Sequence, residues 1–170
     1  MWNAILIREI QEDDAGAFLA LCNLLDEETD FRMYEPGERR TTVDEQRRII
    51  RNVLAWDNHT ILVAEQDGAL IGYLEAIGGT FRRKWHCVQV KVAIFQAHVG
   101  KGIGTQLFIE LERWALEREV QRMELTVMTN NPRAIALYKK MGFEIEGLKR
   151  HALRVDGVYV DEYLMARLLD

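Results

Sequence analysis

A glycine-rich turn is the segment of this sequence whose residue types and spacing best suggest chemistry. It reads Val99-Gly100-Lys101-Gly102-Ile103-Gly104-Thr105, after a strand-like run and before a long helical pattern. Glycine tolerates tight backbone turns, so the chain can curl there and expose several N–H groups. A helix start also has unpaired N–H donors and a partial positive charge, which suit a pyrophosphate. The turn therefore predicts a phosphate site, with a plain strand-to-helix connection as the alternative.

Two common phosphate-binding motifs do not fit this turn. A Walker A loop needs Ser or Thr after its lysine, whereas Lys101 is followed by Gly102. The dinucleotide-binding pattern G-x-G-x-x-G fails in both frames, because its sixth position is Thr105 or Leu107. The turn therefore belongs to neither of these classes.

A second segment, 131–143, makes a family resemblance visible. It reads Asn131-Pro132-Arg133-Ala134-Ile135-Ala136-Leu137-Tyr138-Lys139-Lys140-Met141-Gly142-Phe143 and is similar to the N-x-x-A-x-x-x-Y-x-x-x-G-F segment of the GCN5-related N-acetyltransferase (GNAT) family. The run 92–104 resembles the acetyl-CoA motif of the same family, which is a strand, then Q/R-x-x-G-x-G/A, then a helix. Val99 departs from it, since Gln or Arg is usual there. Both motifs occur in the family's order, and the resemblance covers essentially the whole chain.

The resemblance implies acetyl-CoA as cofactor and names the residues that would hold it. It implies that the backbone amides of the turn bind the pyrophosphate and that the preceding strand meets the pantetheine arm. Asn131 would contact this arm as well as cap its helix, with Pro132 in the first turn. The expected cofactor-binding residues are Val92, Ala93, Ile94, Val99, Gly100, Lys101, Gly102, Ile103, Gly104, Thr105, Asn131 and Tyr138.

Tyr138 is the candidate general acid. In the resembling family the tyrosine at this position points at the sulfur of coenzyme A, and a phenol with a pKa near ~10 can donate a proton to a leaving thiolate. The alternative is a half-buried aromatic on the same helical stripe as Ala134 and Met141. The acceptor needs a base or a dry site as well, because an alkyl ammonium has a pKa near ~10.4.

Glu75 is the candidate general base, because it interrupts an apolar strand-like run where a carboxylate can have a raised pKa. His86 and Gln89 are expected on the next strand, with opposite parity and so on opposite faces. For each of the three side chains, the alternative is a polar group at a strand edge. The other histidines are expected at the surface or in loops, namely His59, His98 and His151.

The segment 26–40 is expected to be a loop that lines the acceptor site, as the same region does in the family. Glu28 and Phe31 are its candidate acceptor-binding residues, because carboxylates suit a cationic amine and aromatics can cover it. Its arginines suit a carboxylate or phosphate elsewhere on the same molecule, namely Arg32, Arg39 and Arg40. The acceptor is then a primary amine, zwitterionic or anionic rather than polycationic. A solvated acidic loop is the alternative.

These candidates need a scaffold of strands and helices. Apolar patterns predict strands over 2–8, 60–65, 70–77, 85–95 and 122–128, and Asp156-Gly157 predicts a final hairpin turn. Helical spacing predicts helices near 13–25, 42–56, 103–119 and 131–141. The predicted fold is an α/β (α+β) GNAT fold over 1–170 as a single domain. It has a mixed, mostly antiparallel sheet of about seven strands and about four helices, splayed centrally to hold acetyl-CoA.

Composition narrows the function classes. The 170 residues carry a net charge of −5, which disfavours a nucleic-acid partner. No apolar run reaches the roughly 18–20 residues that cross a membrane. The sequence has no serine, which excludes a Ser-His-Asp hydrolase. The two cysteines, Cys22 and Cys87, lie in apolar surroundings, so a cytoplasmic compartment is expected and a cysteine nucleophile is a remote alternative.

The sequence thus predicts an N-acetyltransferase that moves an acetyl group directly to an amine in a ternary complex, without a metal. The alternative from another class is a non-catalytic acyl-CoA-binding or sensor module on the same fold. A homodimer is predicted through the final hairpin, whose apolar residues are Val155, Val158, Val160, Leu164 and Met165. Several acceptor classes stay open, including protein N-termini, polyamines, amino acids and aminoglycosides.

Overall fold

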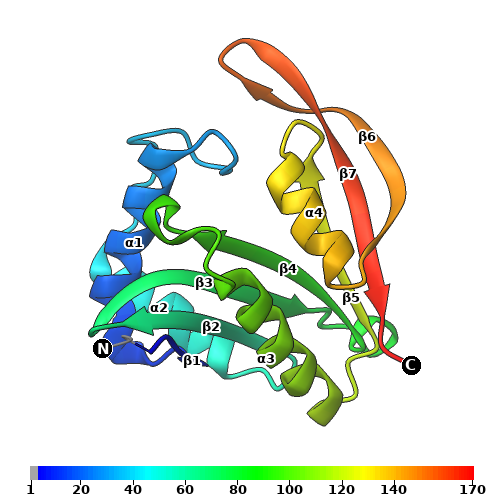
Figure 1. The fold of residues 1–170 in the computed structure, drawn as a ribbon. Helices are drawn as coiled ribbons and strands as arrows, with labels where there is room; N and C mark the ends of the chain where they lie inside the picture. The colour runs from blue at the N-terminus through cyan, green and yellow to red at the C-terminus, as the bar shows by residue number, and fades with distance from the viewer. Residues whose placement is uncertain (1–3) are drawn as a thin grey trace.

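The fold is a seven-stranded mixed sheet with helices on both faces (Figure 1). The computed structural model describes residues 4–170. All neighbouring strands are antiparallel except β4 and β5, in the order β1-β2-β3-β4-β5-β7-β6. The strands are β1 Leu6–Glu9, β2 His59–Gln66, β3 Ala69–Gly78, β4 Cys87–Ile94, β5 Arg122–Met128, β6 Glu144–Val155 and β7 Val158–Leu168. The helices are α1 Ala15–Glu28, α2 Val43–Leu54, α3 Ile103–Glu117 and α4 Pro132–Lys140, with short 3-10 turns η1 Glu12–Asp14, η2 Arg82–Lys84 and η3 Gln96–His98.

This arrangement confirms the predicted mixed, mostly antiparallel sheet with seven strands and four main helices. Trp2, in the predicted first strand, lies outside the described residues, and β1 begins at Leu6. One predicted boundary was wrong. The expected loop 26–40 begins inside a helix, because α1 continues to Glu28 and buries Asp26 against two arginines. None of the helices within residues 4–170 is long and apolar enough to cross a membrane.

Alternate residues of the central strands face two separate hydrophobic cores. Leu62 and Leu74 pack in the core with α3 and α4, whereas Ile61 and Tyr73 pack in the core with α1 and α2. Successive side chains of a strand point to opposite faces, so one sheet serves both cores. The helices are therefore divided between an α1/α2 face and an α3/α4 face.

The strands β4 and β5 are paired only at their beginnings. Their ladder ends at Gln89 opposite Glu124, although β4 continues to Ile94 and β5 to Met128. In Figure 1 the two strands meet at the lower right and diverge upward. Within residues 4–170, no strand pairs with β4 beyond Gln89 on that side, so its backbone groups can bind an extended ligand. We call this opening between residues 90–94 and 125–128 the gap, and it agrees with the predicted central splay.

The connection that leads into β4 is held by a buried polar pair. Asn58 Nδ2 donates to the carbonyls of Gly79 at 2.9 Å and Trp85 at 3.1 Å. His59, expected at the surface, is instead 9% exposed, with its Nδ1 at 2.9 Å from Asn58 Oδ1. The prediction for His59 was wrong because this pair fixes the ends of the β3–β4 loop from inside. The start of β4, and with it the closed end of the gap, is thereby set.

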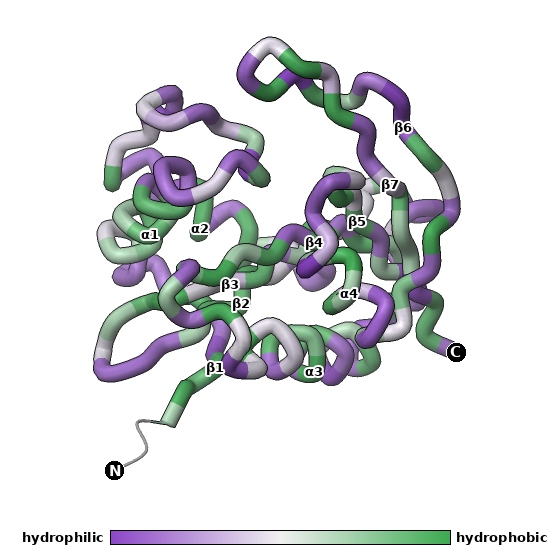
Figure 2. The backbone as a smooth tube through the Cα atoms, turned by 45° about the horizontal axis from the view of Figure 1, so that its top comes forward, coloured by the Kyte–Doolittle hydropathy of each residue, from purple (hydrophilic) through white to green (hydrophobic). Residues whose placement is uncertain are grey.

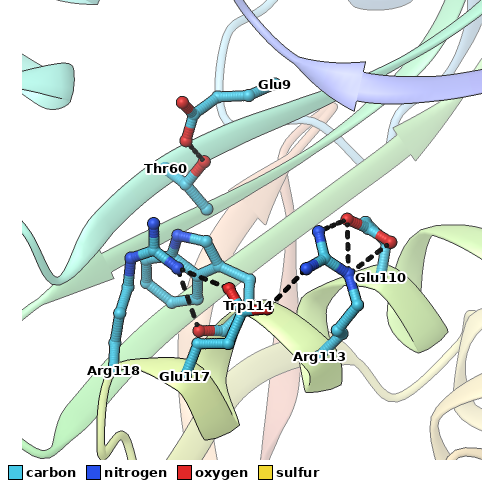
Figure 3. A network of polar contacts seen from close by, with 7 residues as sticks. All are labelled: Glu9, Thr60, Glu110, Arg113, Trp114, Glu117 and Arg118. Atoms are coloured by element: carbon cyan, nitrogen blue, oxygen red, sulfur yellow. Dashed lines mark hydrogen bonds and ion pairs between the residues drawn. The ribbon is translucent and has the colours of Figure 1, made fainter.

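The second half of α3 carries intrahelical ion pairs on its outer side and the buried Trp114 on its inner side (Figure 3). Arg113 pairs with Glu110 and, at 2.6 Å, with Glu117. The guanidinium of Arg118 lies 5.1 Å from the centre of the Trp114 ring, and Trp114 is 4% exposed. The ion pairs link residues of the same helix and support its second half, whereas the burial of Trp114 in the α3/α4 core packs the helix onto the sheet.

The hairpin of β6 and β7 forms the edge of the sheet opposite to β1, and its tip stands away from the helices (Figure 1). Figure 2 shows hydrophobic stretches along this outlying hairpin. Of the predicted pairing residues, Val158 is 65% exposed, but Met165 is 0% exposed and belongs to the core. The prediction that Met165 contributes to a dimer surface was wrong. Its part of β7 pairs with β5 and β6 within the sheet, and its side chain lies in the α3/α4 core.

Candidate active site

The glycine turn adopts the backbone conformation that its sequence predicts. Gly100 and Gly102 have φ angles of +79° and +80°, and a Cβ at either position would meet no atom within 4 Å. Gly104 serves a different purpose, because a Cβ there would lie 2.7 Å from a methyl carbon of Leu137 and 3.3 Å from Ile94 Cδ1. Two glycines thus shape the turn, and the third lets α3 pack closely on α4 and β4.

The turn presents N–H groups that the fold does not use. Among residues 4–170, no backbone carbonyl or side chain accepts from the N–H groups of 100–105. The first engaged amide of α3 is Gln106 N, which donates to the Gly102 carbonyl at 3.0 Å. Unpaired amides at a helix start attract an anion, and Lys101 beside them is exposed. These groups fit a pyrophosphate.

The turn, the end of β4 and helix α4 converge. Gly104 packs so closely on Ile94 of β4 and Leu137 of α4 that a Cβ at this position would collide with Leu137. Lys140 Nζ donates to Thr105 Oγ1 at 3.3 Å, which joins the end of α4 to the start of α3. Lys140 was not among the predicted cofactor residues, and its place beside the turn adds a second cation for a phosphate group.

Tyr138 lies in the α3/α4 core between two aromatic rings. It is 7% exposed, and its ring packs edge-on against Phe108 at 5.9 Å and lies 6.2 Å from Phe143. Burial raises the pKa of Tyr138 to about 12, so the phenol keeps its proton at any physiological pH. The next residue back, Leu137, contacts the glycine turn region. A protonated phenol can donate a proton, and this one is a weaker acid than a free phenol because burial raises its pKa.

Asn131 caps α4 as predicted. Its Oδ1 accepts from Ala134 N at 3.3 Å, and Pro132 occupies the first turn of the helix. Asn131 N in turn donates to the carbonyl of Met128, the last residue of β5, at 3.1 Å. The cap therefore fixes α4 relative to the open end of the gap. Its contact with a cofactor arm stays a prediction.

Glu75 lies on the α1/α2 face, on the same side of β3 as Tyr73. It is partly exposed and stands opposite Lys91 of β4. The parity argument for His86 was wrong, because β4 begins at Cys87 and His86 precedes it as an exposed residue. The carbonyl of His86 accepts from Arg122 N at 3.0 Å, so its backbone supports the closed end of the gap.

The two acceptor candidates of the first helix and its loop differ in their contacts. Both carboxylate oxygens of Glu28 accept from Gln96 N, at 2.9 and 3.0 Å. This bond ties the end of α1 to the turn that follows β4, which sequence reasoning did not foresee. Phe31 is 45% exposed. Acceptor binding by Glu28 and Phe31 stays a prediction.

Neither of the two cysteines has the properties of a nucleophile. Burial raises the pKa of both thiols, Cys22 and Cys87, so neither favours the reactive thiolate form.

His98, in η3 just before the glycine turn, has a buried Nδ1 without a partner in the described part of the chain. Its side chain was expected in a loop without a role, and only the contacts show it as a free polar atom near the turn.

Comparison with known proteins places the whole arrangement in context. The model of the "Acetyltransferase (GNAT) family" matches residues 19–143. The L-amino acid N-acetyltransferase AaaT of Escherichia coli is 38% identical over 112 residues, which cover 63% of this chain and 67% of that protein. A GNAT-family acetyltransferase from Streptococcus pneumoniae has a TM-score of 0.94 at 29% identity, covering 98% of this chain and 100% of that one. The yncA protein of Salmonella typhimurium, solved with its cofactor acetyl-CoA, shares the fold with a TM-score of 0.87 at 23% identity, covering 99% of this chain and 95% of that one.

We expect Gly102→Glu to abolish stabilisation by acetyl-CoA, because the new carboxylate would stand among the amides that suit the pyrophosphate. At 100 times its Kd, acetyl-CoA should stabilise the unchanged protein by about 2.7 kcal/mol, or roughly 5–10 °C in Tm. Differential scanning fluorimetry with and without acetyl-CoA measures this shift.

The matched control for this substitution is Gly157→Glu in the final hairpin. Gly157 has a φ of +81° and the same open surroundings, so it should suffer the same backbone strain and keep the full shift. An equal acetyl-CoA shift in both variants would contradict binding at the turn.

Proposed function

The chain belongs to the acetyltransferase (GNAT) family and is an acetyl-CoA-dependent N-acetyltransferase, and from this we propose that it acetylates a primary amine in the gap between β4 and β5. The observation that supports this placement most strongly is the end of the β4–β5 ladder at Gln89 and Glu124 beside a turn with unused amides. The backbone of Val92, Ala93 and Ile94 would hold the pantetheine arm, and the turn 99–105 would hold the pyrophosphate.

We assign the general base and the general acid to opposite faces of the sheet. Bound acetyl-CoA supplies the acetyl group as a thioester. Glu75, on the α1/α2 face, would accept the proton that the ammonium of the acceptor must lose. Tyr138, on the α3/α4 face, would give its proton to the departing thiolate and take up the second proton that the amine nitrogen loses as the amide forms. Acid and base thus serve the reaction from opposite sides of the gap, and no covalent bond to the protein is needed.

The proposed acid has a clear test in Tyr138→Phe, which removes only the hydroxyl. We expect kcat to fall by about 10²-fold, since general acid catalysis contributes ~10²–10⁴-fold, while the Kd of acetyl-CoA stays nearly unchanged. Because burial raises the pKa of Tyr138 to about 12, its ionisation should cause no loss of activity below about pH 11. The measurement is free-thiol release from acetyl-CoA with the best amine of a panel.

Tyr159→Phe, at a tyrosine that is 57% exposed on the hairpin, is the control and should keep its kcat. A kcat within threefold of the unchanged enzyme for Tyr138→Phe, with chemistry rate-limiting, would make Tyr138 a purely structural residue.

The same proposal includes a homodimer formed through the edge strand β6. This edge has no partner strand in the described chain, and an open edge with apolar side chains favours association. The exposed apolar residues of the hairpin include Ile145, Leu148, Val158 and Tyr159, at 43%, 53%, 65% and 57% exposure. A reducing cytoplasm as its compartment is supported by the two free, buried cysteines.

Light scattering at micromolar concentration should give twice the 19.8 kDa of one chain. Leu148→Asp should halve that mass, because it places a charge in the proposed contact. Ile109→Asp, at an equally exposed aliphatic on α3 (57% exposed), should leave the mass unchanged. A monomeric mass for the unchanged protein would reject the dimer.

A further inference from the structure

Two arginines of the loop after α1 share one buried aspartate, Asp26, which lies in the last turns of that helix. Asp26 is 2% exposed, and its two carboxylate oxygens accept from Arg32 Nε at 3.1 Å and from Arg39 Nε at 2.6 Å. Arg32 Nη1 also donates to Tyr73 Oη at 2.6 Å. The arginine side chains are only 13% and 15% exposed. We call Asp26, Arg32, Arg39 and Tyr73 the arginine cluster.

The arginine cluster carries one positive charge more than its own groups neutralise. Both guanidiniums stay protonated, and Asp26 supplies a single negative charge. Tyr73 stays neutral, because burial raises its pKa to about 12. Glu75 acts on Tyr73 electrostatically but forms no ion pair with either arginine in the described chain. A charge removed from water is costly unless an anion compensates it, so the cluster suits an anion from outside the chain.

Arg32 keeps hydrogen-bond donors for such an anion. A guanidinium has five N–H groups, and the bonds of Arg32 to Asp26, Tyr73 and the Cys22 thiol use three of them at most. The free N–H groups of a guanidinium form a planar fork that matches a carboxylate. The same loop adds an apolar surface of exposed side chains, namely Phe31, Met33 and Tyr34 at 45%, 71% and 40% exposure.

The position of the arginine cluster relates it to the gap. Tyr73 stands opposite Ala93 of β4, which borders the gap. Its ring packs on Phe18 of α1 at 5.0 Å, so the cluster lies on the α1/α2 face. The glycine turn leads instead into α3, on the other face. An acceptor held at the cluster would therefore reach a thioester in the gap from the side opposite to the phosphates.

We propose that the arginine cluster binds the carboxylate of the acceptor, with Arg32 as its main ligand, so that the acceptor is a primary amine that bears a carboxylate, such as an α-amino acid. This inference rests on the proposed function, since it takes the gap as the place of reaction. It separates the acceptor from polyamines and aminoglycosides, which lack the anionic group that the cluster needs.

The test uses L-amino acids and their carboxamides as matched pairs, beginning with L-leucine and L-leucinamide. Thiol release from acetyl-CoA should give kcat/KM values at least tenfold higher for the acid. In Arg32→Gln we expect the value for L-leucine to fall by about 10- to 100-fold, mainly through KM, the range for a lost charge-assisted hydrogen bond. The value for L-leucinamide should stay within about threefold. Comparing each substrate with the unchanged enzyme cancels differences in intrinsic amine reactivity.

Two controls accompany Arg32→Gln. The variant must keep the Tm shift caused by acetyl-CoA, which shows that it is folded and binds its cofactor. Arg48→Gln removes the same charge from an exposed position on α2 and should keep the preference for the acid. Arg32→Lys keeps the charge without the planar fork and should restore only part of the preference.

Binding gives a readout that does not depend on turnover. With coenzyme A present, L-leucine should raise the Tm of the unchanged protein and not that of Arg32→Gln. Loss of turnover with every amine, but with this binding difference intact, would reject the proposed function and leave the carboxylate site standing. Equal kcat/KM values for the amino acids and their carboxamides in every pair would overturn the carboxylate site. Equal losses of kcat/KM for L-leucine and L-leucinamide in Arg32→Gln would overturn it as well.

Discussion

The early end of the hydrogen-bond ladder between β4 and β5 is the constraint on which the rest of this structure depends. Parallel strands normally continue side by side, yet these two share pairs only from Cys87 to Gln89 on β4. A free strand edge inside a sheet leaves polar backbone groups without partners, which is costly unless something else binds them. The fold keeps this opening because both sides are held independently. β4 is anchored by β3 and the buried Asn58, and β5 by β7 and the Asn131 cap.

Positively charged groups lie near the gap on both faces of the sheet. On the α3/α4 face, the amides of the glycine turn offer partial positive charge, and Lys101 and Lys140 lie beside them. On the α1/α2 face, the arginine cluster holds one positive charge more than Asp26 neutralises. A chain with a net charge of −5 thus concentrates positive groups at two places around one gap. Phosphates suit the first place and a carboxylate suits the second.

Local sequence signals predicted the parts of the site that depend on neighbouring residues. The glycine turn and the Asn131 cap follow from a few adjacent residue types, and both have the expected conformation. Contacts between distant segments were not predictable in this way. Glu28 binds Gln96, 68 residues further along the chain.

Such pairings depend on how the sheet brings the segments together. The burial of Asp26 was unpredictable for the same reason. Its neighbours in sequence resemble those of a solvated loop, whereas Arg39, which binds its carboxylate, lies 13 residues away and is brought there by the fold. Met165 was likewise counted among the apolar residues of the final hairpin that a partner could cover, because residue types alone do not show which side chains the sheet itself covers.

Hydrogen–deuterium exchange on the full chain, with and without saturating acetyl-CoA, tests most directly whether the gap and the turn bind the cofactor. Amides that gain a hydrogen-bond partner exchange more slowly. We expect slower exchange in residues 90–94 and 100–105, with the hairpin around Asp156 unchanged. Unchanged exchange in both segments, at a concentration where acetyl-CoA raises the Tm, would contradict binding in the gap and the turn.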